Sequence, residues 1–267
     1  MELIFNQEEY KLWMAIPELK KQEILEGAIN KLLSVAKQQI NFIKDWKEIK
    51  NDDSKSARHL YVFNTVENFW ENIELALYLG QERFSHFAFY PVRTCTETFL
   101  QFHYFAKQSV EEQDNLSIKE LLRSSVRYYK REVDAGGNFN TYKDYYDLHA
   151  SGFGLPPINK IKREEDEIKT FPGVKKLCED YLPQQTSILY FLYQTLCEGG
   201  HGRGIYYAMH QQAEELQEYR RTIMQVYMFC KDILLVLDKV YLGAIFKKEV
   251  LTAVAESDKL IKESIQN

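Results

Sequence analysis

The sequence predicts an all-α protein: a single helical domain with a bundle-like core of long amphipathic helices. Only 12 glycines and 6 prolines occur in 267 residues, so long stretches lack the residues that usually end helices. Hydrophobic residues make up 45% of the chain and aromatic residues 14%, enough for broad contacts between helices. Apolar residues recur every three or four positions, which is typical of amphipathic helices. We therefore interpret residues 1–267 as one domain.

The N-terminal half is expected to hold a series of long helices. Asn6 precedes a glutamine and two glutamates, a pattern that favours a helix start. Pro17 then suits the first position of the next helix, whose apolar residues run from Ile24 to Trp46. Two further helices are expected at 56–80, ended by Gly80, and at 84–107, with Pro91 as a kink or a restart.

The C-terminal half is interrupted more often. Ser117 and Glu120 match a capping box, so a helix is expected from Ser117 to the glycine pair at 136–137. Pro172 and Pro183 each indicate a helix start. Between 140 and 169 we expect a short helix at 140–149, a loop at 151–157 and a solvated mixed-charge run at 160–169. A helix is then expected to end near 198, before a glycine-rich turn. A helix at 213–241 and a final amphipathic helix around 250–261 complete the chain.

Charge and targeting signals favour a soluble, cytoplasmic protein. The net charge is −5, so nucleic acid or anionic lipid would need a local basic patch. The N-terminus lacks the basic and apolar regions of a signal peptide. The most apolar stretch, 223–246, carries four charged side chains, which argues against a membrane span. The four cysteines are widely separated, which favours buried thiols in a reducing compartment and no metal site or redox pair.

Arg93 and Glu97 form the first candidate binding site. They are four residues apart, so they share one face of a helix that is otherwise apolar. A charged pair in such surroundings is either a structural ion pair or the wall of a cleft, and the sequence leaves both open. His103 lies further along the same helix among aromatic residues and is expected to be a core histidine with its hydrogen bonds satisfied.

A second group contains Tyr193, Glu198 and His201, which come just before a glycine-rich turn. A Glu-x-x-His unit is used in di-metal helical bundles, but those sites need two such units and further carboxylates. Only one unit is present here, so no metal or other cofactor is expected. The simpler interpretation is a helix C-terminus at which His201 pairs with Glu198 or with the last carbonyl groups.

Two further patterns would suit nucleic acid. Arg203 and His210 could act in metal-free RNA cleavage, with the histidine moving a proton and the arginine stabilising phosphate charge. Arg123, Arg127 and Arg131 repeat every four residues in a region with a local charge of +3, a basic stripe that could follow a phosphate backbone. A solvated helix face that pairs with acidic residues is the commoner reason for such a stripe.

Two segments together resemble a bacterial all-helical family of unknown function. They are Tyr90–Glu97, which contains Arg-x-x-x-Glu, and Tyr190–Gly202, which contains Tyr-x-x-x-x-Glu-x-x-His-Gly. The resemblance covers about a tenth of the chain. It implies that five side chains gather at one place: Arg93, Glu97, Tyr193, Glu198 and His201.

The spacing of Arg203 and His210 is also similar to the Arg-x(4–6)-His motif of the HEPN ribonucleases, which are common in toxin–antitoxin and phage-defence systems. Those enzymes usually carry a polar residue after the arginine, whereas Gly204 follows Arg203 here. The similarity implies a metal-independent ribonuclease with Arg203 and His210 as catalytic residues.

The sequence thus leaves two functions open. The preferred hypothesis is a helical binding or interaction protein of unknown ligand, with a link to bacterial defence, whose Arg/Glu/Glu/His cluster holds a small polar ligand or is structural. The alternative is the HEPN-like ribonuclease, so whether the chain is an enzyme stays open. Partners are unknown: a homodimer and RNA on the basic stripe are both compatible with the sequence, and no membrane is expected.

Overall fold

The computed structural model describes residues 7–44, 53–80, 88–137, 141–200 and 212–266, and for some of these, including Glu198, it describes the backbone alone. These residues form helices joined by turns and contain no strand, which confirms the all-α prediction. The helices are α1 (Gln7–Ala15), α2 (Glu18–Lys44), α3 (Asp53–Leu79), α4 (Phe89–Ala106), α5 (Val110–Asp134), α6 (Thr141–Ala150), α7 (Glu164–Glu167), α8 (Val174–Tyr181), α9 (Thr186–Gly200), α11 (Gln212–Val240) and α12 (Lys247–Glu263).

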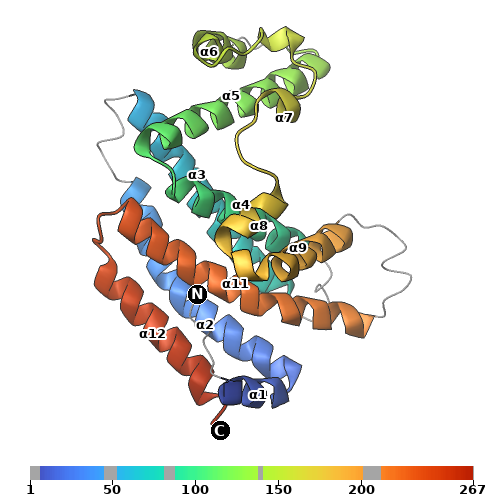
Figure 1. Ribbon diagram of the computed structural model, residues 1–267, viewed down its shortest axis with the longest axis vertical. Coiled ribbons are helices and arrows are strands. Elements are labelled where there is room, and N and C mark those ends of the chain that lie inside the picture. Colours follow the sequence, from blue (N-terminus) through green and yellow to red (C-terminus); the bar gives the residue numbers. More distant parts are fainter. Residues whose placement is uncertain (1–6, 45–52, 81–87, 138–140, 201–211, 267) are drawn as a thin grey trace.

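Helix α4 lies at the centre of the arrangement, in contact with α3, α8, α9 and α11 (Figure 1). Its many aromatic residues explain this position, because such a helix buries apolar surface on several sides at once. Phe99 shows the packing: its ring stacks on Phe229 of α11, with the ring centroids 4.3 Å apart, and meets Tyr181 of α8 edge-on at 4.9 Å. The fully buried aromatic residues of α4 are Phe89, Phe99, Phe102 and Phe105.

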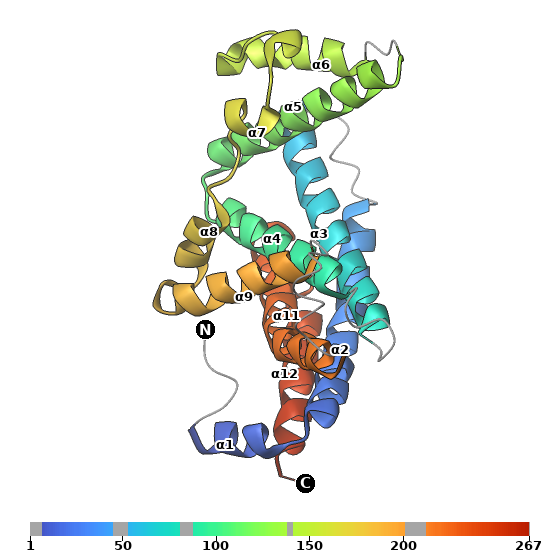
Figure 2. The same ribbon diagram turned by 90° about the vertical axis from the view of Figure 1, so that its right-hand side faces the viewer.

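Helices α2, α11 and α12 form a layered bundle at one end of the molecule (Figure 2). The apolar rhythm of α2 explains its place between the other two, because Leu25, Ile29 and Leu32 lie on one face and are all buried. Ser257 of α12 donates a hydrogen bond to the carbonyl of Ala28 at 3.1 Å. The long expected helix after Pro17 therefore exists and supplies much of the main core.

Helices α5, α6 and α7 enclose a second, smaller hydrophobic cluster at the opposite end of the molecule (Figures 1 and 2). Tyr146 of α6 is completely buried there, and its hydroxyl donates to the carbonyl of Pro156 at 2.8 Å. Ile161 and Ile168 are also buried in this cluster. The expectation of a solvated mixed-charge run at 160–169 is confirmed for most of its charged side chains, which are exposed, but the two isoleucines anchor the segment against α5 and α6.

The expected start of α5 at Ser117 is wrong. Helix α5 begins at Val110, and its N-cap is Ser109, whose hydroxyl accepts a hydrogen bond from the backbone N–H of Glu112 at 3.2 Å. Ser117 lies inside the helix, where its hydroxyl donates to the carbonyl of Gln113 at 2.7 Å. Both serines are followed three residues later by glutamate, so the local pattern is ambiguous. Because no helix-breaking residue lies between Ser109 and Ser117, the helix begins after Ser109, the first of the two possible caps.

The end of α5 follows the expected glycine signal. Gly136 has φ of +76°, and the N–H groups of Gly136 and Gly137 donate back to the carbonyls of Val133 and Glu132. This is the left-handed C-terminal turn that glycine adopts most easily. A β-carbon at Gly136 would meet no atom within 4 Å, so any penalty for a side chain there must come from backbone strain.

Replacement of Gly136 by alanine is therefore expected to lower the free energy of unfolding by about 1 kcal/mol, the approximate cost of a left-handed conformation for an L-residue. Gly152→Ala is the matched control, because a β-carbon there also meets no atom within 4 Å and its φ is not positive. Urea unfolding of both variants checks the prediction. Equal stability of the two variants would contradict it.

The side chain of His103 on α4 packs toward α8, and its hydrogen bonding differs from what the sequence predicts. Its imidazole packs against the rings of Phe99 and Tyr181, with centroid distances of 5.9 and 4.8 Å. Its Nδ1 is buried and has no hydrogen-bond partner among the described residues, since the nearest carboxylate oxygen, from Asp180, is 3.8 Å away. Burial, reinforced by the nearby Lys107 ammonium and partly opposed by Asp180, lowers the pKa of His103 to about 4. The histidine is half-buried at the edge of the core, and its Nδ1 is not satisfied.

This lowered pKa predicts a loss of stability in mild acid. As the pH falls below 6.5, the unfolded chain binds a proton that His103 in the folded chain does not bind until the pH approaches 4. Protonation therefore favours unfolding within this window. We expect the free energy of unfolding to fall more steeply between pH 6.5 and 4 for the wild type than for His103→Gln. Parallel pH profiles from urea unfolding would contradict the prediction.

Candidate functional site

Helix α4 presents Arg93 and Glu97 to its neighbour α9. The Nε and Nη2 atoms of Arg93 lie 3.4 and 3.3 Å from Oε1 of Glu97. The two side chains are 27% and 32% exposed, so the pair is neither fully buried nor freely solvated. Val92 and Thr96, which precede the two charged residues, are buried, whereas Thr94 and Thr98, which follow them, are half-buried, so the pair lies at the edge of the main core. The pair is therefore not a fully buried ion pair, and neither residue lines the groove described below.

Tyr193 of α9 joins this pair. Its hydroxyl donates a short hydrogen bond to Oε1 of Glu97, and its ring lies 6.0 Å from the Arg93 guanidinium carbon. Burial, together with Cys197 and Glu97, raises the pKa of Tyr193 far above its ordinary value. The phenol therefore stays protonated and acts as a donor. Arg93, Glu97 and Tyr193 form what we call the Arg–Glu–Tyr cluster.

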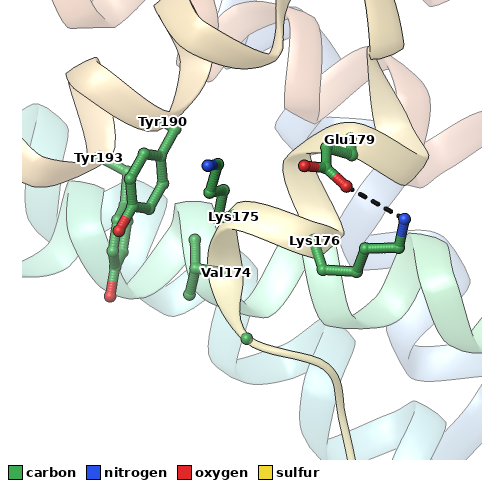
Figure 3. Close-up of a pocket in the computed structure, with 7 residues that line it drawn as sticks. Val174, Lys175, Lys176, Glu179, Tyr190 and Tyr193 are labelled. Carbon is green, nitrogen blue, oxygen red and sulfur yellow. Dashed lines mark hydrogen bonds and ion pairs between the residues drawn. The ribbon is translucent and has the colours of Figure 1, made fainter.

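An open groove adjoins this cluster, with a volume of about 480 Å³. Figure 3 shows its wall: the rings of Tyr190 and Tyr193 on one side, the start of α8 on the other, and Lys175 between them. The two rings are nearly parallel, with an interplanar angle of 22° and centroids 6.4 Å apart. The lining residues are Gly173, Val174, Lys175, Lys176, Glu179, Tyr190 and Tyr193.

The groove exists because two helices meet there. Tyr190 and Tyr193 are three residues apart on α9 and so share a face. Helix α8 starts opposite them after Gly173, which provides no side-chain cap, and both helices pack against α4. Tyr193 is the residue common to the groove and the Arg–Glu–Tyr cluster, because its hydroxyl bonds to Glu97 while its ring lines the groove.

Sequence reasoning found the cluster but missed most of the groove. Arg93, Glu97 and Tyr193 were all named from their spacing and from the family resemblance, and the structure places them together. Tyr190 could have been found from its i,i+3 relation to Tyr193. Lys175 carries no such signal, because its importance depends on how α8 meets α9. Cys197 is half-buried next to Tyr193, while the other three cysteines are buried as expected.

Three of the residues named from sequence, His201, Arg203 and His210, lie outside the part of the chain that the structure describes. The backbone of Glu198 is described in the last turn of α9, but its side chain is not. Their proximity to the Arg–Glu–Tyr cluster, and the proposed catalytic pair of a HEPN-like ribonuclease, stay predictions.

The basic stripe on α5 meets acidic and polar groups from the segment that follows α6. Nε of Arg127 lies 3.5 Å from Oε1 of Glu164, and Lys130 binds the other oxygen of Glu164 at 3.2 Å. Arg123 donates to the hydroxyl of Thr170 at 3.4 Å, whereas Arg131 is exposed. Arg127 therefore pairs with an acidic residue of the same chain, which is the commoner reason for such a stripe. Binding of RNA to this stripe stays a prediction.

Within the described residues, no three histidine, cysteine, aspartate or glutamate side chains are grouped closely enough to hold a metal ion. No described helix is long and apolar enough to cross a membrane. Comparison of the chain with protein-family models, curated proteins and solved structures found no match. The function must therefore be argued from the site itself.

Proposed function

We propose that this chain is a helical binding protein whose groove beside the Arg–Glu–Tyr cluster holds a small polar ligand. The observation that carries the proposal is the double role of Tyr193, which lines the groove with its ring while Glu97 holds its hydroxyl. The groove is open and has a volume of about 480 Å³, so a small ligand would lie against its wall and stay partly exposed to solvent.

The Arg–Glu–Tyr cluster gives this groove a fixed wall. Arg93 holds the Glu97 carboxylate through two nitrogen atoms, and that carboxylate holds the Tyr193 hydroxyl. A side chain that is already fixed loses little conformational entropy when a ligand binds. In this proposal the half-buried ion pair positions the ring of Tyr193 from the edge of the core, without occupying the groove.

The test is equilibrium dialysis of the purified protein against a low-molecular-weight metabolite extract, with retained compounds identified by mass spectrometry. We expect Tyr190→Ala to retain the bound compound roughly tenfold less well, because one aromatic contact is worth about 1.4 kcal/mol. Tyr193→Phe is expected to weaken retention to a smaller extent, because the ring remains but its bond to Glu97 is lost.

Tyr10→Ala is the matched control, since Tyr10 is 55% exposed on α1 and does not line the groove. It should leave retention unchanged. A protein that retains no compound, or one whose retention is the same in Tyr190→Ala and Tyr10→Ala, would rule out a ligand site in this groove.

A further inference from the structure

The charges that line the groove do not cancel. Lys176 pairs with Glu179 at 3.0 Å, which neutralises both groups. Lys175 is exposed and has no acidic partner among the described residues. The lining therefore carries one net positive charge, in a protein whose net charge is −5. A positively charged lining attracts anions locally, even though the net charge of the whole chain is negative.

The wall opposite α8 supplies a different chemistry. The nearly parallel rings of Tyr190 and Tyr193 offer aromatic faces, against which a flat ring packs well. Aromatic faces also attract cations, but the Arg93 guanidinium already lies over the Tyr193 ring and Lys175 borders the same groove. A cationic ligand would meet repulsion from both groups.

We infer that the groove binds a small organic anion with a flat ring, its charge at Lys175 and its ring against Tyr190 and Tyr193. This inference rests on the proposed function and adds the chemical class of the ligand. A carboxylate and a phosphate ester both offer negatively charged oxygen atoms to Lys175, so the class includes both. The open groove of about 480 Å³ has room for a single substituted ring with a short polar extension.

Calorimetric titration with simple probes tests the inference. Benzoate and phenyl phosphate carry ring and charge, benzyl alcohol carries the ring alone, benzylamine reverses the charge, and inorganic phosphate lacks the ring. We expect both aromatic anions to bind about threefold more tightly than benzyl alcohol, a modest gain because solvent screens an ion pair with an exposed lysine. Phenyl phosphate should also bind more tightly than inorganic phosphate, and the relative affinities of the two anions distinguish a carboxylate site from a phosphate site.

Variants assign the preference to particular residues. Lys175→Gln should abolish the preference for anions and leave the affinity for benzyl alcohol unchanged. Lys248→Gln, the same change at an exposed lysine on α12, should keep that preference. Both lysines are exposed, so neither change is expected to unfold the protein.

Three outcomes would overturn the inference: benzylamine binding as tightly as benzoate, an anion preference that survives Lys175→Gln, or inorganic phosphate binding as tightly as phenyl phosphate. A protein that retains a metabolite in dialysis but binds no aromatic anion would refute the ligand class and leave the groove as a binding site. A protein that does neither would refute both proposals.

Discussion

Replacement of Phe99 by alanine should cost about 3–5 kcal/mol of unfolding free energy, the usual range for removing a buried phenylalanine side chain. Phe99 is completely buried in α4. Its ring stacks on Phe229 of α11 and meets Tyr181 of α8 edge-on, so the cavity left by the alanine would open between three helices. Rigid helices on all sides limit how far this cavity can collapse, which adds to the loss of buried apolar surface.

Phe191→Ala is the matched control. It removes the same atoms from α9, where Phe191 is 65% exposed, so the change in stability should stay within about 0.5 kcal/mol. Urea unfolding monitored by circular dichroism measures both. A midpoint for Phe99→Ala that equals that of Phe191→Ala would show that α4 is not the centre of the core.

Replacement of Asp258 by alanine is expected to cost about 2 kcal/mol, because it leaves a largely buried ammonium and a tyrosine hydroxyl without their acceptor. Nζ of Lys231 lies 2.8 and 2.7 Å from the two oxygens of Asp258, and the lysine side chain is only 12% exposed. The hydroxyl of Tyr227 donates to the same carboxylate at 2.8 Å. Without Asp258, both the ammonium and the hydroxyl lose their acceptor between α11 and α12.

Glu256→Ala provides the comparison on the same helix. Glu256 pairs with Lys31 at 3.5 Å, but the two side chains are 58% and 43% exposed, so the loss should be below about 1 kcal/mol. A second check is Lys231→Met combined with Asp258→Ala, which removes the orphaned charge and should recover part of the lost stability. A double variant less stable than Asp258→Ala alone would contradict this explanation.

Most helices could be predicted because their signals are local and repeated. The chain takes a left-handed conformation at position 136 where α5 ends, and glycine is the residue that adopts this conformation most easily. The start of α5 could not be decided locally, since Ser109 and Ser117 are both followed three residues later by glutamate. Ile161 and Ile168 were hidden among charged neighbours, and their burial depends on α5 and α6.

Part of the candidate site could be predicted from local spacing, and the rest depends on tertiary packing. Arg93 and Glu97 share a helix face by spacing alone, so their pairing could be predicted from the sequence. Lys175 lies on α8, and it becomes part of a groove only because α8 and α9 both pack against α4. The spacing of residues along the sequence does not predict how these helices pack. The unsatisfied Nδ1 of His103 is likewise a result of tertiary packing, since it depends on where Asp180 of α8 lies.

A crystal structure of the protein with the compound retained in dialysis would show whether the groove between α8 and α9 is a ligand site. We expect difference density between Lys175 and the rings of Tyr190 and Tyr193, with the hydroxyl of Tyr193 still bonded to Glu97. Clear density for the compound anywhere else on the protein, with this groove empty, would contradict this expectation.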